Sequence, residues 1–442
     1  MKFTLFSRTA ALVSASLLMA AQPARAAGRS LIIIGWDTLR ADHISALGYK
    51  RKTTPNLDAL AARSALFTKA ISPSSWTLPS FMSVFTSLYP SEHGLTNKFK
   101  LPPAGSTELD PAVLSTGAVT LAELLKANGY RTAAFTGGAG VGGAFGFSRG
   151  FDVYEDSRNF AGFETTFPEA LDWLKKSKDA PYFLFIHGYS THPFHDLKPG
   201  GPYSFISAGE KAKVPGIRQR HEKMRMQLLE GKKLKYTKED VQLWTDVYDE
   251  KILRTDRLLG DFLKKLGALG RPEPVIILLA DHGEELFDHG GVDHGMTLYD
   301  EMIHVPLLIS VPGAKARRVD SQVRTLDIFP TVIDLLGLKA DDGLKKQLRG
   351  VSLAPQLSGS EPDLNAFSET DYLFHFSKRS IREAGGLKLT ADVLSRKNEF
   401  YDTAADPSEK KDLSEKDPAR SYILEMELFD WEDGLAPAGA HQ

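Results

Sequence analysis

The sequence predicts an α/β fold with a mostly parallel central sheet, and two patterns support this prediction. Five short apolar runs are nearly continuous rather than alternating, and they are rich in β-branched and aromatic residues, as in strands buried on both faces. These runs are residues 31–36, 132–135, 182–186, 275–280 and 306–310. Helical patterns lie between them, at 55–62, 120–128, 167–175, 238–266 and 326–336. Strands and helices that alternate in this way form a mostly parallel sheet with helices on both sides.

Local signals mark single elements and one interruption. The runs at 31–36, 182–186 and 275–280 read LIIIGW, YFLFI and VIILLA. The helix at 120–128 is followed by Gly129, which ends a helix well because glycine adopts the left-handed conformation at low cost. Residues 196–240 break the alternation, because they are basic and interrupted by Gly and Pro, and we interpret them as a long insertion.

The C-terminal part of the chain follows a weaker pattern after Leu338. Short strands and turns are expected near 386–392 and 398–413, and a terminal helix near 420–431. We therefore expect a catalytic domain at 27–338 and a smaller C-terminal α+β subdomain at 339–442.

The first residues resemble a Sec-type signal peptide. Lys2 and Arg8 precede an apolar run at 10–20, and Ala24-Arg25-Ala26 supplies small residues for cleavage. The run is shorter than the roughly 20 residues of a membrane span, although a membrane anchor is the alternative. No later apolar segment reaches that length, so the sequence predicts a signal peptide at 1–26, a periplasmic or secreted protein and no stable membrane span.

Composition limits the classes of protein. The chain has 442 residues, of which 42% are hydrophobic and 25% charged, with a formal charge of −2 and no Cys. The composition is globular, and an exported protein without Cys has no disulfides and must be stabilised by its core. Nothing indicates a nucleic-acid partner. The basic stretch 211–235 is most simply a solvated surface, with a rim for an anionic substrate as the secondary interpretation.

Residue types that bind metals follow three of the predicted strands. In chain order they are Asp37, then His187 and His192, then Asp281 and His282, with His294 twelve residues after His282. The carboxyl ends of parallel strands meet at one edge of a sheet, where ligands bind. Each residue alone could cap or close a strand. For His187 in particular, closing a strand is the alternative to binding the metal. Together they predict one divalent-metal site, in which His favours Zn or Mn, with Ca as an alternative.

Thr77 lies where a helix is expected to begin. Pro79 is pre-organised for a first helical turn, so Thr77 is at or just before the helix start. The free N–H groups and the dipole at that end favour an anion. From this position alone, Thr77 is either an N-cap, worth about 1 kcal/mol, or a nucleophile beside the metal.

Several ordered motifs carry a family resemblance. They are IIIGWDTLRADHISALGY, TPNLDALAARSALFTKAISPSSWTLPSFMSVFTSLYPSEHG, TLAELLKANGYRTAAF, ADHGEELFDHGGVDHGMTLYDEMIHVPLLI and EFYDTAADPSEKKDL. In this order they resemble the sulfatase branch of the alkaline phosphatase superfamily, from about Leu31 to Leu413. The resemblance implies a large α/β sandwich with a mostly parallel central sheet and a smaller C-terminal sheet.

The resemblance also implies roles for single residues. The implied metal ligands are Asp37, Thr77, Asp281 and His282, and the implied catalytic residues are Thr77, His192 and His294. Thr77 falls at the nucleophile position of the family, His192 matches an active-site His, and His294 resembles a His of the phosphoethanolamine transferases. Three further histidines have simpler interpretations as loop or core residues, namely His93, His289 and His304.

The chain departs from the sulfatases at the nucleophile. Those enzymes carry Cys or Ser in a C/S-x-P-x-R pattern and oxidise it to formylglycine, whereas this chain has Thr77-Leu78-Pro79-Ser80-Phe81. Thr cannot be converted in this way, and Phe stands where Arg is needed. Thr38 replaces a second Asp of many sulfatases, and Ser190 stands near where the two-metal phosphodiesterases have a carboxylate. One tightly held ion is therefore expected, with a second, weakly held ion as an alternative.

Three functions remain open from the sequence. The first is an exported metal-dependent hydrolase of an anionic ester, either a phosphate ester, a phosphate diester or a phosphonate, through a covalent Thr77 intermediate. The second is a sulfatase that acts without formylglycine, and the third is a non-catalytic binding protein with the same fold. Hydrolysis is favoured over transfer to lipid, because only a signal peptide precedes the catalytic region. The sequence names neither the substrate nor the oligomeric state.

Overall fold

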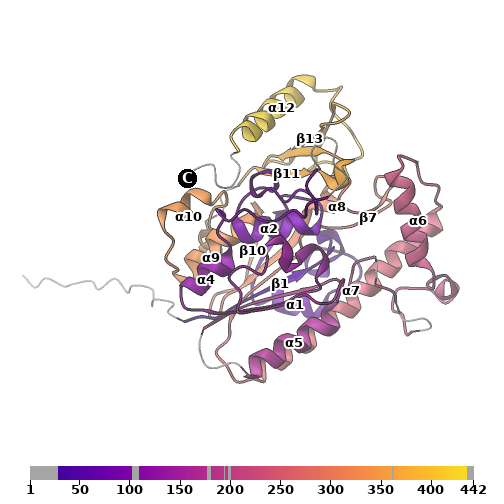
Figure 1. Ribbon diagram of the computed structural model, residues 1–442. Helices are drawn as coiled ribbons and strands as arrows, with labels where there is room; N and C mark the ends of the chain where they lie inside the picture. The colour runs from indigo at the N-terminus through magenta and orange to yellow at the C-terminus, as the bar shows by residue number, and fades with distance from the viewer. Residues whose placement is uncertain are drawn as a thin grey trace, which may run out of the picture.

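A computed structural model of the chain describes residues 28–101, 109–176, 181–193, 195–197, 201–360 and 363–435. The predicted signal peptide, residues 1–26, lies outside the described residues. A large central sheet with helices on both faces makes up most of the molecule, and a smaller sheet carrying helix α12 lies at one end of it (Figure 1).

The central sheet has eight strands in the order β10-β2-β9-β6-β1-β5-β3-β4. In chain order these are β1 (Leu31–Trp36), β2 (Ala65–Ile71), β3 (Arg131–Phe135), β4 (Val153–Glu155), β5 (Tyr182–Gly188), β6 (Val275–Leu279), β9 (His304–Ser310) and β10 (Arg317–Arg324). Strand β9 is antiparallel to both neighbours, and every other pairing is parallel. The predicted mostly parallel sheet is therefore confirmed.

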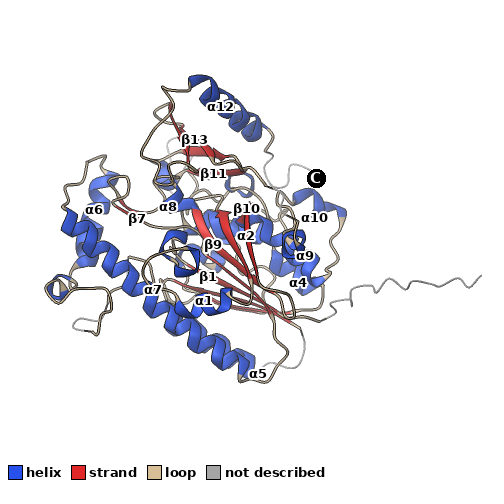
Figure 2. Ribbon diagram, turned by 180° about the vertical axis from the view of Figure 1, so that it is seen from behind, coloured by secondary structure: helices blue, strands red, loops and turns tan. Residues whose placement is uncertain are grey.

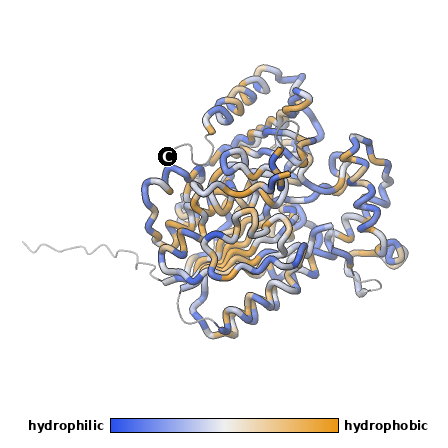
Figure 3. Tube along the Cα trace, in the orientation of Figure 1, coloured by the Kyte–Doolittle hydropathy of each residue, from blue (hydrophilic) through white to orange (hydrophobic). Residues whose placement is uncertain are grey.

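Helices cover the sheet on both sides (Figure 2). On one face lie α1 (Pro55–Ala61), α5 (Phe163–Lys176) and α7 (Lys238–Gly267), and on the other lie α2 (Thr77–Thr86), α4 (Leu121–Ala127) and α9 (Ile328–Leu336). The start of α4 is fixed by a capping box, in which Thr120 Oγ1 accepts a hydrogen bond from the Glu123 N–H at 3.2 Å. Its end is marked by Gly129, with φ of +86°. Between these layers the strands β1, β5 and β6 are fully buried, and apolar residues concentrate there (Figure 3).

The smaller sheet is an antiparallel meander. Its strands are β11 (Ala366–Thr370), β12 (Lys378–Arg382), β13 (Leu387–Asp392) and β14 (Lys397–Asp402). Helix α12 (Pro418–Asp433) packs on it through a separate apolar cluster of Ile381, Leu389, Ala391, Phe400, Leu424 and Leu428. This arrangement confirms the predicted fold class, an α/β sandwich with a smaller C-terminal sheet.

The remaining elements are short or belong to the insertion. Helix α6 (Ile217–Leu229) lies within the predicted insertion and stands at the side of the molecule beside the ribbon of β7 (Glu285–Leu286) and β8 (Val292–Asp293) (Figures 1 and 2). The other short helices are α3 (Pro90–His93), α8 (Asp300–Ile303), α10 (Asp342–Gln347) and α11 (Ala354–Ser358). Among the described residues, no helix has both the length and the apolar character that a bilayer crossing requires.

Several elements differ from the prediction. Helix α5 begins four residues before the predicted start, with Pro168 inside it, so the proline lies in the second turn rather than the first. Strand β10 was not predicted, because its sequence RRVDSQVR is polar and it forms an edge of the sheet. Strand β2 was missed as well, although five of its seven residues are buried, because Thr68 and Lys69 interrupt its apolar run.

Candidate active site

The residues predicted to bind a metal lie at the carboxyl ends of three adjacent strands. Strand β1 leads directly into Asp37, β6 is followed by Ala280 and then by Asp281 and His282, and β5 contains His187 near its end. These strands are neighbours in the order β6-β1-β5, so their ends converge. The four side chains are each at most 1% exposed.

The hydroxyl of Thr77 lies at the centre of this group. Thr77 Oγ1 donates a hydrogen bond to Asp37 Oδ1 at 3.1 Å and lies 3.3 Å from His282 Nε2. His282 Nε2 is in turn 3.4 Å from Asp281 Oδ2 and 3.8 Å from Asp37 Oδ1. The structure therefore brings Asp37, Thr77, Asp281 and His282, the four predicted ligands, into one cluster.

The start of α2 delivers Thr77 to this position. Thr77 is the first residue of the helix, the N-cap is the extended Trp76, and no side chain caps the helix start. The Thr77 side chain therefore points to the cluster instead of capping. The neighbouring loop contains Gly140, and a Cβ atom there would lie 2.7 Å from Thr77 Cβ. Only glycine lets the loop approach the carbon atoms of the Thr77 side chain so closely.

The cluster has the donor set and the electrostatics that a divalent cation requires. Ligand atoms of Asp37, His187 and Asp281 all lie within 4.8 Å of one another. Asp37 Oδ2 and both ring nitrogens of His187 are buried without a hydrogen-bond partner among the described residues. Burial and the nearby Asp281 raise the pKa of Asp37, and burial raises the pKa of Asp281 to about 7. A cation would relieve this uncompensated negative charge, so the residues fit a divalent ion.

Both imidazoles of the cluster are held neutral. Burial lowers the pKa of His187 to about 3, and burial followed by repulsion from His294 lowers the pKa of His282 well below its ordinary value. His282 Nδ1 lies 2.8 Å from the Gly283 carbonyl oxygen, to which it donates, so the lone pair of Nε2 faces Thr77. A neutral imidazole with a free nitrogen is the form that coordinates a metal.

His294 and His192 lie beside this cluster. The His294 ring centroid is 4.4 Å from that of His282 and 5.1 Å from that of His192. His294 Nδ1 is 3.2 Å from Glu284 Oε2 and 3.2 Å from Asp293 Oδ1. Burial opposes the charged form, but these two carboxylates outweigh it and raise the pKa of His294 to about 9. His294 is therefore a cation at neutral pH, next to a buried His192 whose pKa is lowered by burial and by His294 itself.

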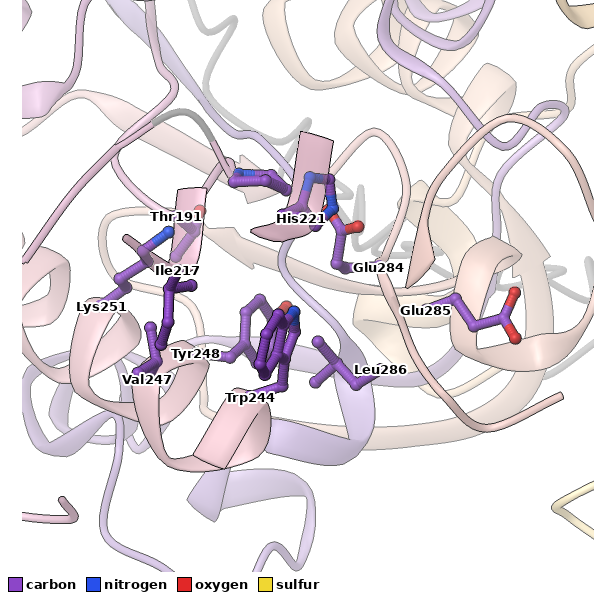
Figure 4. Close-up of a pocket in the computed structure, with 11 residues that line it drawn as sticks. Thr191, Ile217, His221, Trp244, Val247, Tyr248, Lys251, Glu284, Glu285 and Leu286 are labelled. Carbon is purple, nitrogen blue, oxygen red and sulfur yellow. The ribbon is translucent and has the colours of Figure 1, made fainter. Parts of the chain in front are cut away.

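A second group of metal-binding residue types lies behind His294. His221 from α6 meets Glu284 and Asp293, with ligand atoms within 4.8 Å of one another and all three residues buried. Beside them is a small cavity of about 30 Å³, drawn in Figure 4 with His221 and Glu284 on one side and the rings of Trp244 and Tyr248 on the other. Such a volume holds no more than one or two water molecules.

The three further histidines, and the residues at which the chain departs from the sulfatase pattern, lie in the following surroundings. His93 contacts the Pro79 carbonyl oxygen, His289 pairs with Glu301, and His304 contacts the Thr68 carbonyl oxygen. Phe81, at the position of the sulfatase arginine, packs edge-on against His187 with centroids 5.1 Å apart. Ser190 donates to Glu164 Oε2 at 3.1 Å, and the Thr38 hydroxyl has no hydrogen-bond partner among the described residues.

Sequence reasoning identified some of these neighbours and missed others. It left His187 undecided, and the structure places it within the first cluster. It missed Glu284 and Asp293, although each is close in sequence to a predicted residue. It also missed His221, for which the sequence carries no signal beyond a histidine in a basic stretch, because only the packing of α6 on β8 brings it to the site.

Comparison with known proteins places this chain in a family. The family described as Sulfatase matches residues 29–338, which is more than half of the chain, so the chain belongs to the sulfatase family. The predicted resemblance is thereby confirmed at the level of the family. The predicted class of enzyme, an ester hydrolase, is confirmed at the same level.

Two relatives and one solved structure are similar to this chain. A Delta 4,5-hexuronate-2-O-sulfatase of Bacteroides thetaiotaomicron is 32% identical over 34% of this chain and 32% of its own length. An ulvan-active sulfatase of Formosa agariphila is 24% identical over 87% of this chain and 76% of its own. The phosphonate monoester hydrolase of Agrobacterium radiobacter has the same fold, with a TM-score of 0.71, 22% identity, and coverage of 92% of this chain and 96% of that one. The chain spans about a third of the length of the first of these, so its own activity and substrate are matters of proposal.

Proposed function

We propose that the protein is a metal-dependent ester hydrolase of the sulfatase family that uses Thr77 as its nucleophile. One observation carries the proposal. The Thr77 hydroxyl lies within 3.1 Å of Asp37 Oδ1 and 3.3 Å of His282 Nε2, in a buried cluster with excess negative charge. A residue that only capped the helix would not need this contact between its hydroxyl and a prospective metal site. The contact therefore supports the assignment of Thr77 as an activated nucleophile.

The metal would be held by Asp37, Thr77, Asp281 and His282, and the position of His187 supports its addition to this set. A bound divalent ion would polarise the ester oxygens and ease deprotonation of a nearby hydroxyl. Mixed carboxylate and imidazole donors favour Zn or Mn, with Ca as the alternative. A second, weakly held ion remains a prediction.

The protein residues would act as follows. Thr77 Oγ1, deprotonated before the reaction, attacks phosphorus in line, so that a bond from phosphorus to Oγ1 forms and the bond from phosphorus to the leaving oxygen breaks. The N–H groups at the start of α2 stabilise the negative charge of the group transferred. His294, a cation at neutral pH, lies where it could hold the substrate anion or protonate the leaving oxygen, with His192 beside it. Water then attacks the phosphorus and gives a proton to His294, the bond from phosphorus to Oγ1 breaks, and the phosphate or phosphonate product leaves as the deprotonated Oγ1 is restored.

We propose phosphate monoesters, phosphate diesters or phosphonate esters as the substrate class. A formylglycine hydrate releases sulfate by elimination from a geminal diol, but Thr77 has a single hydroxyl and lacks this route. A phosphorylated Thr77 can be cleared by a second in-line displacement. The named phosphonate monoester hydrolase shares the fold, which supports phosphorus chemistry on this scaffold without assigning it to this chain.

A sulfate ester is the second candidate substrate. Both curated relatives named above are sulfatases, and the family is described by that activity. In this case sulfated Thr77 would have to be cleared by water attacking sulfur. This alternative would make the protein a sulfatase that acts without formylglycine.

The deciding experiment compares substrates with one metal-replete preparation. Multiple turnover is measured with p-nitrophenyl phosphate, bis-p-nitrophenyl phosphate, a p-nitrophenyl phosphonate and p-nitrophenyl sulfate. We expect the phosphorus esters to be hydrolysed much faster. Faster Thr77-dependent turnover of the sulfate ester would replace the proposal by the sulfatase alternative. A metal-loaded protein that hydrolyses none of them would support the non-catalytic alternative.

We also propose the domain limits and the location predicted from the sequence. These are a signal peptide at 1–26, a catalytic domain at 27–338, a C-terminal subdomain at 339–442 and a periplasmic or secreted protein. N-terminal sequencing of the protein recovered from outside the cytoplasm tests the cleavage after Ala26.

A further inference from the structure

We propose that Glu284 and Asp293 are positioning residues that hold the His294 ring so that its Nε2 atom is free to face the reacting ester. This inference rests on the proposed function, because it concerns the orientation of one residue of that same site. Neither carboxylate belongs to the prospective metal ligands, and neither is used by the reaction steps described above.

Hydrogen bonding determines which nitrogen of His294 is available. Nδ1 lies 3.2 Å from Glu284 Oε2 and 3.2 Å from Asp293 Oδ1, so both carboxylates converge on the same ring atom. A carboxylate oxygen accepts and does not donate, so Nδ1 carries a hydrogen. With Nδ1 occupied in this way, Nε2 is the nitrogen that remains for the substrate. Pairing of a histidine with an outer carboxylate is a common way to fix both tautomer and ring direction.

The backbone around His294 is also held in an unusual conformation. Asp293 has a φ of 82° and Gly295 a φ of +86°, so the residues on both sides of His294 are left-handed. Asp tolerates this region better than most residues. A Cβ atom at Gly295 would lie 2.7 Å from the Tyr372 ring, so glycine is required there for close packing as well. Such a turn persists only when its surroundings fix it, and strained turns cluster at functional sites.

The surroundings of the turn fix it from three directions. Thr370 Oγ1 in the C-terminal sheet donates to the Gly295 carbonyl oxygen at 2.8 Å. Arg225 of α6 forms an ion pair with Asp293 and donates to the Tyr372 hydroxyl at 2.9 Å. Arg40 Nη1 donates to the Glu284 carbonyl oxygen at 3.0 Å. Glu284 and Asp293 are thus rigidly supported, as positioning residues must be.

A second metal site is the competing interpretation of these residues. His221, Glu284 and Asp293 have suitable ligand types, and His221 Nε2 and Glu284 Oε1 have no hydrogen-bond partner among the described residues. However, Asp293 already pairs with Arg225, both carboxylates lie against the His294 ring, and Lys251 lines the adjoining cavity. A cation would have to compete with these positive groups, so the geometry favours positioning.

The test uses conservative variants with a matched control. Glu284→Gln and Asp293→Asn each remove the charge while keeping the shape, and Asn tolerates the left-handed backbone of Asp293. The control is Glu285→Gln, the same change at the adjacent residue, whose carboxylate accepts from the His289 and Gly291 N–H groups and does not contact His294. We expect kcat to fall about 10- to 100-fold in the two test variants, with KM near the wild-type value and the control unchanged.

A spectroscopic readout separates orientation from activity. The spectra are recorded above pH 9, because the pKa of His294 is raised to about 9 and only the neutral ring has tautomers. In protein labelled with ¹⁵N-histidine, and with His294 assigned by its loss in His294→Gln, the neutral ring of the wild type should carry its hydrogen on Nδ1. Glu284→Gln and Asp293→Asn together should give a mixture of tautomers. Wild-type His294 without a hydrogen on Nδ1 would overturn the inference, as would kcat values equal to that of the control.

Two further outcomes are decisive. If the test variants lose a second equivalent of bound Zn or Mn per chain that the control retains, these residues form a metal site and the positioning inference is wrong. If the wild type hydrolyses no ester, the proposed function fails, and the spectra alone decide the orientation. In that case, an unchanged tautomer in the double variant overturns the inference, and a mixture supports it.

Discussion

Thr77 combines two properties in one side chain. It begins a helix, where unpaired N–H groups attract anions, and its hydroxyl contacts an aspartate and a histidine of a buried acidic cluster. A threonine that only capped α2 would direct its oxygen back to the helix N–H groups. The direction of this side chain therefore carries the functional argument at the scale of a single residue.

The first prediction concerns the Thr77 oxygen. Thr77→Ala should reduce kcat by at least about a thousandfold, because no other group at that position can form the covalent intermediate. Thr77→Ser keeps the oxygen and should retain measurable activity. Steady-state rates with the best phosphorus ester provide the measurement. Equal rates for Thr77→Ala and wild type would show that water attacks directly and that Thr77 has another role.

The second prediction concerns the metal. Asp37→Asn removes one of two buried carboxylates whose mutual repulsion a cation would relieve, so the variant should hold less metal. Elemental analysis of the purified wild type should give roughly one tightly held Zn or Mn per chain. Chelation should abolish activity, and adding the metal back should restore it. Full activity in a demonstrably metal-free protein would contradict this prediction.

At the scale of an element, the loop that contains Gly140 shows how packing controls the nucleophile. This loop follows β3 and passes over the start of α2, where the Tyr189 hydroxyl accepts a hydrogen bond from the Gly140 N–H at 2.9 Å. A side chain at Gly140 would push against Thr77 and not merely against solvent. The loop thus limits the directions that the Thr77 hydroxyl can take.

The third prediction uses this loop. Gly140→Ala places a Cβ atom 2.7 Å from Thr77 Cβ, so it should cost about 1–3 kcal/mol of stability and lower kcat by displacing Thr77. Gly142→Ala is the matched control. Its new Cβ atom would lie 3.4 Å from the Ala139 carbonyl oxygen, an ordinary van der Waals distance, and the φ of −64° suits alanine. Thermal unfolding and steady-state rates measure the two effects. Equal behaviour of both variants would show that the loop does not constrain Thr77.

Which elements could be predicted from the sequence depends on where their partners lie. Strands β1, β5 and β6 are central and apolar on both faces, so their sequences alone identify them. Strand β10 is polar, and its pairing with β2 decides its structure. The candidate site divides in the same way. Asp37 and Asp281 follow predicted strands closely, whereas His221 reaches the site from an insertion that only tertiary packing places there.

At the scale of the whole molecule, charged contacts tie the C-terminal part to the catalytic part, beside a small apolar cluster that includes Ala366 of β11 and Ile71 of β2. His289, after β7, lies 2.6 Å from Glu301 Oε1 and 3.1 Å from the Glu409 carbonyl oxygen, and it stacks on Tyr299. Since the C-terminal sheet also supports the turn that carries His294, these contacts connect overall stability with the site.

The fourth prediction is a pH dependence of this connection. Burial opposes the charge on His289, but Glu301 outweighs it and raises the pKa of His289 above its ordinary value. The folded state therefore binds this proton more tightly than the unfolded state does. The contribution of His289 is fully present below about pH 6.5 and is lost as the pH rises through the folded pKa.

His289→Gln measures that contribution. The difference in unfolding free energy between wild type and variant should be about 1–2 kcal/mol at pH 6 and should shrink toward pH 9. Chemical denaturation at a series of pH values gives this difference. Glu301→Gln should show the same trend, because it removes the partner of the same proton. A difference that is constant with pH would mean that His289 is neutral in the folded protein.

The last prediction concerns a buried lysine that joins the C-terminal sheet to helix α8. Lys388 on β13 is fully buried, and its Nζ lies 3.0 Å from Asp300 Oδ1 and 2.9 Å from Glu409 Oε1. Asp300 begins helix α8, close to the end of the catalytic part, so this cation holds the C-terminal sheet against it. Lys388→Met would leave two buried carboxylates with less positive charge, and it should cost about 3–5 kcal/mol in unfolding free energy.

A matched control exists in the same sheet. Lys378 on β12 pairs with Asp392 at 2.7 Å, but both side chains are partly exposed, so Lys378→Met should cost at most about 1 kcal/mol. If the two variants lose equal stability, the buried ion pair is not what holds the C-terminal sheet against α8. If Lys388→Met also lowers kcat while Lys378→Met does not, the loss reaches the active site through Thr370 and the turn at Gly295. A large loss of stability with unchanged kcat would instead show that the turn keeps its shape when this connection is weakened.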